Sequence, residues 1–493
     1  MSEVIAATQS GKVRGEAMNG VRRFLGIPYA ASPTGSRRFA PPEAARAWEG
    51  IRNATVPGAT APHRLRAFPS LDVAPLVGGG WRQGDDYLTA NVWAPDDGGT
   101  GKPVMVWIHG GGFVIGSNDT SASDGTSFAR DGIVCFAINY RLGVEGFLPI
   151  PGVPTNLGLR DMITGLRWVK DNAAAFGGDP GNITVFGESA GAMAIANLIA
   201  SPLAKGLFNR AIVQSGHGAM MRPIAVAERL VRKMAKILRV TPDKAGFSSL
   251  PPEACFDALD KVSAPNARID LRDAEGREPV FGISRFVPVH GDDVLPCAPI
   301  EALRKGAGAE IDVLIGTNRD EMNLYLVPTG VRDKIWGWLA TYVLGKSQPH
   351  ARRVLKAYGL GRVAKPGLAL VDAMNDLVFR WPARRFAEEH KGRTHMYEFD
   401  WRSPACDGEL GACHGMELPF VFDTLTTVTG PKGLAGDAPP QELADHVHSL
   451  WVGFARDGSL PWNAFERSTR LVYSMEAREA RHEPPMAAAP FLP

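Results

Sequence analysis

A serine with small neighbours is the first feature of the sequence that could do chemistry. Gly187-Glu188-Ser189-Ala190-Gly191 matches the pattern G-x-S-x-G. It lies between a predicted strand over 183–186 and a predicted helix over 190–199. A sharp strand-to-helix turn exposes a serine as a nucleophile, and only small residues fit two positions before and after it. The alternative is an inert serine in a Gly-rich turn. The flanking strand and helix favour the nucleophile.

A run of glycines precedes this turn in the sequence. His109-Gly110-Gly111-Gly112-Phe113 follows a predicted strand over 104–108. Glycines leave the backbone N–H groups unshielded, so a developing oxyanion can accept hydrogen bonds from them. Each such donor typically stabilises a transition state by about 3–4 kcal/mol. A flexible turn or a phosphate loop is the alternative, but a phosphate loop has Lys and then Ser or Thr after its glycines.

A nucleophilic serine needs a histidine to take its proton and a carboxylate to orient that histidine. In the α/β-hydrolase order both follow the serine. A predicted strand over 311–315 is followed by Asp320 and Glu321, and the residues alone leave the choice between these two open. Nine histidines follow Ser189. His414 stands in a Gly-flanked loop after a strand, where a positioned yet mobile base belongs.

The elements that must position these groups alternate between strand and helix. Short apolar runs predict strands over 104–109, 133–140, 183–186, 211–213, 311–315 and 395–399. Helical periodicity predicts helices over 157–176, 190–199, 224–238, 331–344 and 441–455. This order favours one α/β domain over 1–493, with a mostly parallel sheet and helices on both faces. We expect 217–305 and 325–410 to be helical insertions that form a cap.

Composition excludes several functions. The chain has 493 residues, with 54 Lys and Arg against 52 Asp and Glu, so no basic excess predicts a nucleic-acid partner. The five cysteines form no C-x-x-C pair, which favours free thiols in a reducing cytosol. No secretory signal pattern and no apolar stretch of membrane-spanning length are evident. We therefore expect a cytoplasmic protein without a membrane or nucleic-acid partner; the oligomeric state stays open.

An ordered set of motifs resembles the type-B carboxylesterase family, the cholinesterase-like branch of the α/β-hydrolases, and in particular its bacterial para-nitrobenzyl-esterase-like members. The motifs extend over most of the chain. They are Gly26-Ile-Pro-Tyr-Ala30, Arg38-Phe39, Pro41-Pro42, Asn91-Val-Trp93, Val106-Trp-Ile-His-Gly-Gly-Gly-Phe113, Asn139-Tyr-Arg-Leu-Gly143, Gly146-Phe147, Asn156-Leu-Gly-Leu-Arg-Asp161, Phe176-Gly-Gly-Asp-Pro180, Phe186-Gly-Glu-Ser-Ala-Gly191, Gln214-Ser-Gly216, Asp320-Glu321 and His414-Gly-Met-Glu-Leu-Pro419.

The resemblance implies a serine esterase with an α/β-hydrolase fold that needs no metal and no organic cofactor. It implies Ser189 as nucleophile, Glu321 as orienting acid and His414 as base. The implied oxyanion hole consists of the amides of Gly111, Gly112 and Ala190. Glu188 and Ser215 are implied as supports near the histidine.

Two positions depart from the family pattern. Tyr87 stands where many secreted members carry a cysteine, and Met322 replaces the glycine usual after the acid.

The expected reaction is hydrolysis of short-chain or aryl carboxylic esters through an acyl-enzyme. Carbamate or aryl-amide cleavage by the same groups is the alternative, and a non-catalytic binding protein is a remote one. A lipase is disfavoured, because no amphipathic lid with an exposed apolar face is evident.

Overall fold

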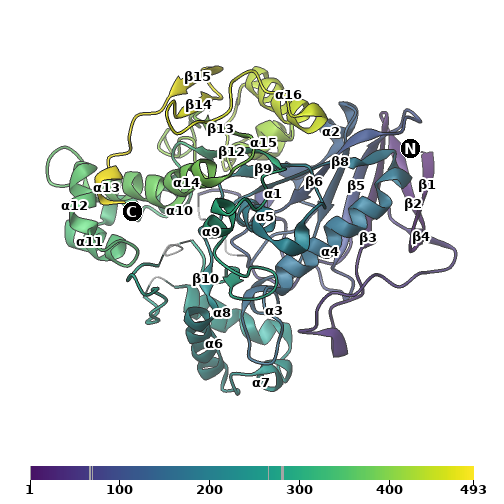
Figure 1. Cartoon of the computed structure of the whole chain (residues 1–493), viewed down its shortest axis with the longest axis horizontal. Coiled ribbons are helices and arrows are strands. Elements are labelled where there is room, and N and C mark those ends of the chain that lie inside the picture. The colour runs from purple at the N-terminus through teal and green to yellow at the C-terminus, as the bar shows by residue number, and fades with distance from the viewer. Residues whose placement is uncertain (1, 66–67, 69, 265, 279–282, 493) are drawn as a thin grey trace.

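One large sheet runs through the molecule in the computed structural model (Figure 1), which describes residues 2–492 except 66–67, 69, 265 and 279–282. In spatial order its strands are β1 (Ser2–Thr8), β2 (Gly11–Met18), β3 (Val21–Pro28), β5 (Thr89–Pro95), β7 (Val134–Ile138), β6 (Lys102–Ile108), β8 (Gly178–Glu188), β9 (Arg210–Gln214), β12 (Asp312–Asn318), β13 (Thr394–Phe399), β14 (Leu471–Ser474) and β15 (Glu479–His482). The short strand β4 (Ile51–Asn53) pairs with β2.

The centre of the sheet is parallel and its two edges are antiparallel. Every neighbouring pair from β7 to β14 is parallel. The pairs from β1 to β7 along the order, and the pair β14–β15, are antiparallel. Parallel strands need crossover connections, and helices supply them here. The predicted mostly parallel sheet is therefore confirmed.

Both faces of the sheet are buried under helices, and successive side chains of a strand point to opposite faces. On β6, Val104, Val106 and Ile108 belong to one hydrophobic core, whereas Met105 and Trp107 belong to a second core on the other face. This explains why the central strands read as continuous apolar runs rather than as alternating ones.

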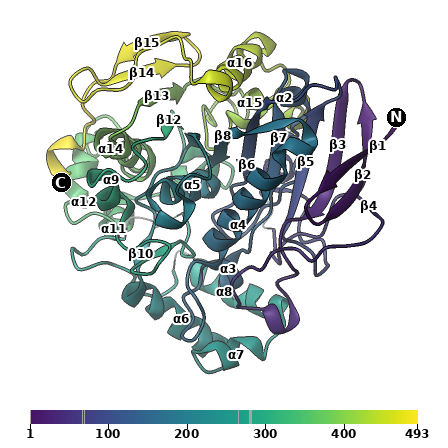
Figure 2. The same ribbon diagram turned by 45° about the vertical axis from the view of Figure 1, so that its right-hand side comes forward.

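Helices cover the two cores. The first core takes in apolar residues of α4 (Leu157–Asn172) and α5 (Ala190–Ala200), and the second takes in those of α16 (Gln441–Asp457). Figure 2 shows α4 and α5 in front of the parallel strands and α16 at the top of the view. The predicted helix over 157–176 ends earlier as an α-helix, with a 3-10 turn over Ala173–Phe176 and a left-handed Gly177 after it.

The two expected insertions contain most of the remaining helices. The range 217–305 holds α6 (Ile224–Leu238), α7 (Lys244–Ser248), α8 (Phe256–Ser263), α9 (Pro299–Arg304) and a small sheet of β10 (Arg222–Pro223) and β11 (Val289–His290). The range 325–410 holds α11 (Gly337–Gly345), α12 (Ala351–Ala357), α13 (Pro366–Met374), a π-helical turn (Asn375–Arg380) and α14 (Trp381–Glu389). It also holds β13, which is a strand of the main sheet, so the helical part of this range ends at Glu389.

A buried ion pair ties the loop after β7 to helix α4. Nη2 and Nε of Arg141 lie 2.6 and 2.8 Å from the carboxylate of Asp161, and both side chains are almost fully buried. The backbone N–H of Arg141 also donates to Asp161, at 3.0 Å. A buried pair with this many hydrogen bonds holds its two segments in one arrangement, because either charge alone would be strongly destabilised.

None of the helices in the described part of the chain combines the length and the apolar character that crossing a bilayer requires.

The remaining short helices are α1 (Ala74–Val77), α2 (Thr126–Arg130), α3 (Gly143–Phe147), α10 (Asn323–Leu326) and α15 (Leu418–Val421). Of these, α15 directly follows the segment that carries His414.

Candidate active site

Ser189 occupies a strained turn between β8 and α5. Its backbone has φ 54° and ψ −121°, a combination that side-chain-bearing residues rarely adopt. Strand β6 passes so close to this turn that it excludes side chains. A Cβ on Gly191 would lie 1.9 Å from the carbonyl oxygen of Ile108, and one on Gly187 would lie 2.6 Å from it. The two glycines of the G-x-S-x-G pattern are therefore a steric requirement.

His414 and Glu321 meet beyond the carboxyl end of β12. Nδ1 of His414 lies 2.6 Å from Oε2 of Glu321, and the carboxylate is fully buried. The other carboxylate oxygen of Glu321 accepts a hydrogen bond of 2.8 Å from the backbone N–H of Asn318. The backbone N–H of His414 donates to the Glu321 carbonyl at 3.2 Å. These bonds fix the ring with its Nε2 edge away from the acid.

The neighbouring acid Asp320 faces elsewhere. Its Oδ2 accepts hydrogen bonds from Nη1 of Arg402, at 2.7 Å, and from the backbone N–H of Ala412, at 3.0 Å. The residues alone left Asp320 and Glu321 as alternatives. In the structure Glu321 contacts His414, whereas Asp320 contacts Arg402 and Ala412, which precede His414 in the chain.

Glu188 lies at the other edge of the imidazole. Its Oε1 is 3.0 Å from Nε2 of His414, although the two atoms are not aligned as a hydrogen bond. Burial raises the pKa of Glu188 to about 8, against the opposing effect of His414. Burial alone would lower the pKa of His414, but the charges of Glu188 and Glu321 outweigh it and raise that pKa to about 9. Each of the two groups therefore takes up a proton more readily than it would in water.

Ser189 and His414 line one cavity, but no hydrogen bond joins them in this structure. Hydrogen bonds of this kind are often long or misaligned in the absence of a bound substrate. Phe379 and Tyr325 pack against the imidazole, with ring centroids 5.0 and 5.6 Å away. They limit the positions that the ring can take.

Glu417 is a third buried carboxylate of this site, and sequence analysis assigned it no role. It accepts hydrogen bonds from Nδ2 of Asn318, at 2.6 Å, and from Nε2 of Gln214, at 3.3 Å. Burial raises its pKa to about 6, and the charge of Glu321 acts in the same direction. The sequence did contain a signal for this residue, since Glu417 is an acidic residue in the apolar run Met416–Phe420. A charge in a buried segment needs polar partners.

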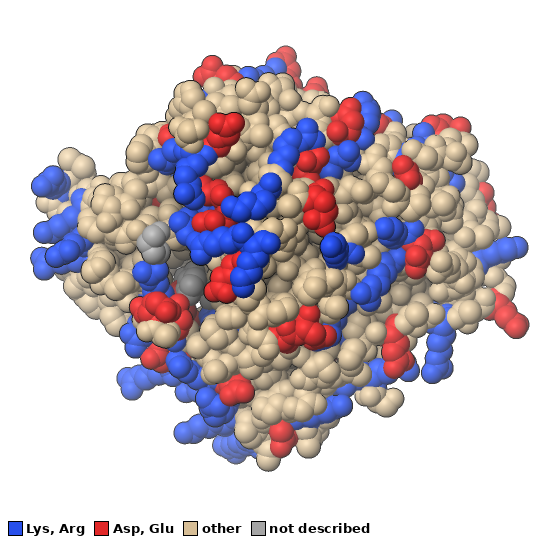
Figure 3. Space-filling model, in the orientation of Figure 1, with Lys and Arg blue, Asp and Glu red and all other residues tan. Residues whose placement is uncertain are grey.

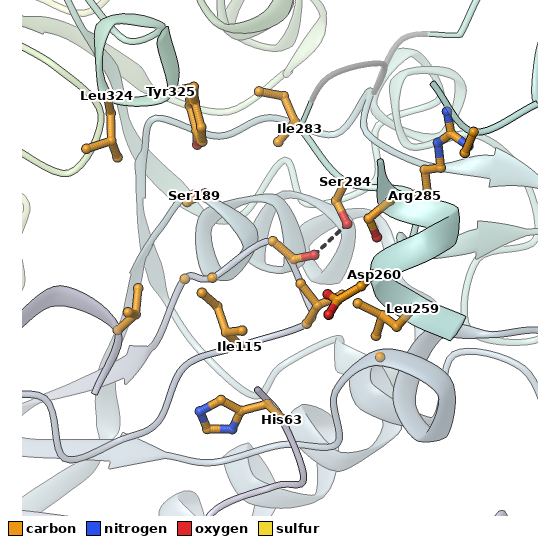
Figure 4. Close-up of a pocket in the computed structure, with 18 of the residues that line it drawn as sticks. His63, Ile115, Ser189, Leu259, Asp260, Ile283, Ser284, Arg285, Leu324 and Tyr325 are labelled. Carbon is orange, nitrogen blue, oxygen red and sulfur yellow. Dashed lines mark hydrogen bonds between the residues drawn. The ribbon is translucent and has the colours of Figure 1, made fainter. Parts of the chain in front are cut away.

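The glycine loop Gly110–Gly112 lines the same cavity as Ser189. Gly111 and Gly112 have φ of +100° and +61°, which favours glycine. Among the described residues, none accepts a hydrogen bond from the amides of Gly111, Gly112 or Ala190. Ser284, which sequence analysis did not single out, donates from its Oγ to the carbonyl of Gly112 at 2.6 Å (Figure 4). This bond anchors the loop to a segment between α8 and β11.

The remaining expected positions have different surroundings. Ser215 is fully buried with a φ of 52°, but its hydroxyl has no hydrogen-bond partner among the described residues. Met322 is buried, lines the cavity and donates its backbone N–H to Asn375 at 2.8 Å. Tyr87, at the position of a cysteine in many secreted members, donates its hydroxyl to Glu145 at 2.8 Å.

The cavity that contains Ser189 has a volume of about 1170 Å³ and a largely apolar lining. Figure 4 shows Ser189 with Ile115, Leu259, Ile283, Leu324 and Tyr325 arranged around the space. Helices α8 and α11 and the segment after each of them supply other parts of the wall. Within the described residues, no cluster of His, Cys, Asp and Glu has the arrangement of a metal site.

Comparisons with known proteins show the family to which the chain belongs. The model of the carboxylesterase family matches residues 2–483. The chain is 37% identical to a para-nitrobenzyl esterase of Bacillus subtilis, over 95% of this chain and 94% of that protein. It is 34% identical to a phenmedipham hydrolase of Pseudarthrobacter oxydans, over 92% and 90%, and 32% identical to a fumonisin B1 esterase of Sphingopyxis macrogoltabida, over 95% and 86%.

Solved structures give the same result. A carboxylesterase of Geobacillus stearothermophilus superposes with a TM-score of 0.82 at 33% identity, covering 97% of this chain and 98% of that one. A para-nitrobenzyl esterase superposes with a TM-score of 0.79 at 33% identity, covering 98% of each chain. The chain therefore belongs to the carboxylesterase family, and it is a carboxylic ester hydrolase with an α/β-hydrolase fold.

Proposed function

We propose that the protein is a serine carboxylesterase that acts through an acyl-enzyme, with Ser189 as nucleophile, His414 as base and Glu321 as orienting acid. The observation that carries the proposal is the 2.6 Å contact between His414 and Glu321 at the cavity that also contains Ser189. The residue order, serine then acid then histidine, is the order of this fold.

In the proposed reaction, Oγ of Ser189 turns toward Nε2 of His414 and attacks the ester carbonyl as the imidazole takes its proton. The amides of Gly111, Gly112 and Ala190 stabilise the tetrahedral oxyanion. His414 then donates the proton to the departing alcohol. Water repeats the sequence on the acyl-enzyme and releases the carboxylic acid. No step needs a metal ion or an organic cofactor.

Glu188 has a supporting part in this proposal. Because its carboxylate faces Nε2 at 3.0 Å, it stabilises the imidazolium that forms when His414 takes the serine proton. Asn318 holds Glu321 and Glu417 with its backbone and side-chain N–H groups. It keeps the two carboxylates in separate hydrogen bonds.

The cavity supports esters with a short acyl chain or an aryl group. A volume of about 1170 Å³ with an apolar lining accommodates an aromatic ring beside the serine. We propose that the helices of 217–305 and 325–410 act as the cap that encloses it. Carbamates and aryl amides are the second candidate class, because the same groups attack their carbonyls and only the shape of the cavity discriminates.

We also propose a cytoplasmic location. It rests on the five described cysteines, all of which are free thiols.

Substitution of the serine tests the proposal. Ser189→Ala is expected to lower kcat/KM for p-nitrophenyl acetate by several orders of magnitude. Ser248→Ala, an exposed serine on α7, is the matched control and keeps its activity. An organophosphate is expected to label the protein stoichiometrically, with the adduct on the peptide that contains Ser189. Normal turnover by Ser189→Ala, or an adduct on another residue, would contradict the proposal. A panel of acetate, butyrate and aryl esters with a carbamate and an anilide decides between the substrate classes.

A further inference from the structure

Exposed aromatic side chains are concentrated in helix α11 and at the residue just before it. Trp336, Trp338 and Tyr342, which we call the aromatic rim, are 71%, 71% and 57% exposed. Val331, Val363 and Leu368 are exposed in the same part of the chain. An exposed tryptophan is individually unremarkable in a protein, but a cluster of large apolar side chains on one element marks an interaction surface.

Helix α11 divides its side chains among three environments. Ala340 and Leu344 are buried in the core, and Leu339 and Val343 line the cavity that contains Ser189. Trp336 and Trp338 do neither and face solvent. Tyr342 both lines the cavity and is exposed, so this helix lies at the cavity's opening.

The surroundings of the aromatic rim are strongly basic. Residues 331–368, which we call the basic lobe, contain eight Lys and Arg residues and one acid, Asp333, in a chain whose net charge is only +2. The only one of the eight that forms an ion pair with a described residue is Arg332. The other seven are Lys334, Lys346, Arg352, Arg353, Lys356, Arg362 and Lys365. Figure 3 shows Lys and Arg gathered at the left-hand end, where α11 and α12 lie in Figure 1.

We infer that the aromatic rim and the basic lobe together dock the protein on an anionic lipid surface. Trp and Tyr are the side chains enriched at bilayer interfaces, where an apolar ring and a polar edge are both accommodated. Each Lys or Arg near an anionic leaflet strengthens binding about fivefold. The two features share residues 331–368, and Lys and Arg gather at the end of the molecule where α11 and α12 lie (Figures 1 and 3).

Charge argues against a second copy of the chain as the occupant. A symmetric contact through this face would bring two basic lobes together, and juxtaposed like charges disfavour association. The cavity opening argues for lipid over nucleic acid. The aromatic rim stands beside an apolar opening, and apolar compounds dissolved in a bilayer would meet it directly. This last point rests on the proposed function, whereas docking itself does not.

Sequence analysis expected no membrane partner and found no amphipathic lid. The reason is that residues 335–344 are apolar on nearly every side of the helix, so no periodic pattern distinguishes an exposed face. Only the packing of α11 against its neighbours shows which of these side chains remain in solvent.

Flotation of the full-length protein with vesicles tests the inference. We expect binding to vesicles of phosphatidylcholine with phosphatidylglycerol, weaker binding at high salt, and little binding to phosphatidylcholine alone. The double variant Trp336→Ser, Trp338→Ser should partition about tenfold more weakly. Lys356→Gln and Arg352→Gln should each weaken partitioning about fivefold, the fold-change that corresponds to about 1 kcal/mol.

The matched control is Ile51→Ser with Val56→Ser, which also replaces two exposed apolar side chains by serine, but outside the basic lobe. It should bind vesicles like the wild type. Activity on soluble p-nitrophenyl acetate should be unchanged in the tryptophan double variant, which shows that it folds. Ser189→Ala should still bind vesicles, so a failure of docking is distinguishable from a failure of the proposed function.

Three results would overturn the inference. The first is no binding to anionic vesicles at low salt, and the second is equal binding by the tryptophan variant. The third is a different occupant. A dimer in analytical ultracentrifugation that the tryptophan substitutions dissociate would assign the face to a second copy. An oligonucleotide that binds tightly in place of vesicles would assign it to nucleic acid.

Discussion

Oε1 of Glu188 lies 3.0 Å from Nε2 of His414, so carboxylates flank the imidazole at both of its nitrogens. Glu321 occupies the Nδ1 side at 2.6 Å. Glu188 is the residue just before Ser189, and the strained turn at Ser189 therefore also places this carboxylate. The geometry makes the charge of Glu188 a determinant of how readily His414 accepts a proton.

The pH dependence of catalysis follows from this arrangement. A general base acts only in its unprotonated form, so kcat/KM should fall as the pH falls through the pKa of His414. That pKa is raised to about 9, because Glu188 and Glu321 outweigh the opposite effect of burial. The midpoint of the acid limb should therefore lie above about 6.5, the ordinary value for histidine.

Glu188→Gln should move that midpoint to lower pH by about one pH unit, because it removes one of the two carboxylates that favour the imidazolium. The measurement is kcat/KM for p-nitrophenyl acetate across the pH range. Asp320→Asn is the control, since this carboxylate faces Arg402, and its profile should match the wild type. Superimposable profiles for Glu188→Gln and the wild type would show that Glu188 does not set the pKa of the base.

The orienting acid can be tested by a pair of adjacent substitutions. Glu321→Gln should lower kcat by about 10³–10⁴-fold, because the histidine loses the carboxylate that selects its tautomer and stabilises its charge. Asp320→Asn should retain most of the activity, since Asp320 contacts Arg402 and Ala412 instead. Both are read from steady-state kinetics and circular dichroism. The reverse pattern of losses would place Asp320 in the site.

Steric exclusion at the serine turn predicts a strong effect of one methyl group. In Gly191→Ala the new Cβ would lie 1.9 Å from the carbonyl oxygen of Ile108, so β6 and α5 must separate. We expect a loss of roughly 3 kcal/mol or more in the free energy of unfolding, together with loss of activity.

Gly453→Ala is the matched control within helix α16. Among the described residues, the atom nearest to the new Cβ outside the helix is the carbonyl oxygen of Ser459, at 3.6 Å. Alanine is also more favourable than glycine in a helix interior by about 1 kcal/mol. Thermal unfolding of both variants measures the contrast. A Gly191→Ala protein as stable and active as the wild type would show that the turn can open without cost.

The buried pair Arg141–Asp161 predicts a stability effect without a catalytic role. Asp161→Asn leaves a buried guanidinium uncompensated and should cost about 3–5 kcal/mol in the free energy of unfolding. Glu228→Gln, which breaks the exposed pair of Glu228 and Arg232 on α6, should cost less than about 0.5 kcal/mol. Denaturant titration measures both, and equal effects of the two substitutions would contradict the difference in burial.

The sequence by itself determined the local geometry of the site. Gly187, Ser189 and Gly191 between an apolar strand and a helix require a strand–turn–helix, since each signal depends on neighbours a few positions apart. The run of alternately directed apolar residues in β6 likewise predicted a strand buried on both faces. The glycines at 111 and 112 predicted backbone N–H groups that no side chain shields.

Tertiary structure decided which remote side chains meet. Asp320 and Glu321 are adjacent and chemically alike, and the residues alone could not separate them. The packing of the His414 loop against the end of β12 brings Glu321 to the imidazole and turns Asp320 toward Arg402. The carboxylates of Glu188 and Glu417, and the hydroxyl of Ser284, are placed by chain segments that lie far apart in sequence. The exposure of Trp336 and Trp338, at the start of α11, also depended on tertiary structure, because burial depends on what packs against a helix as well as on its own residues.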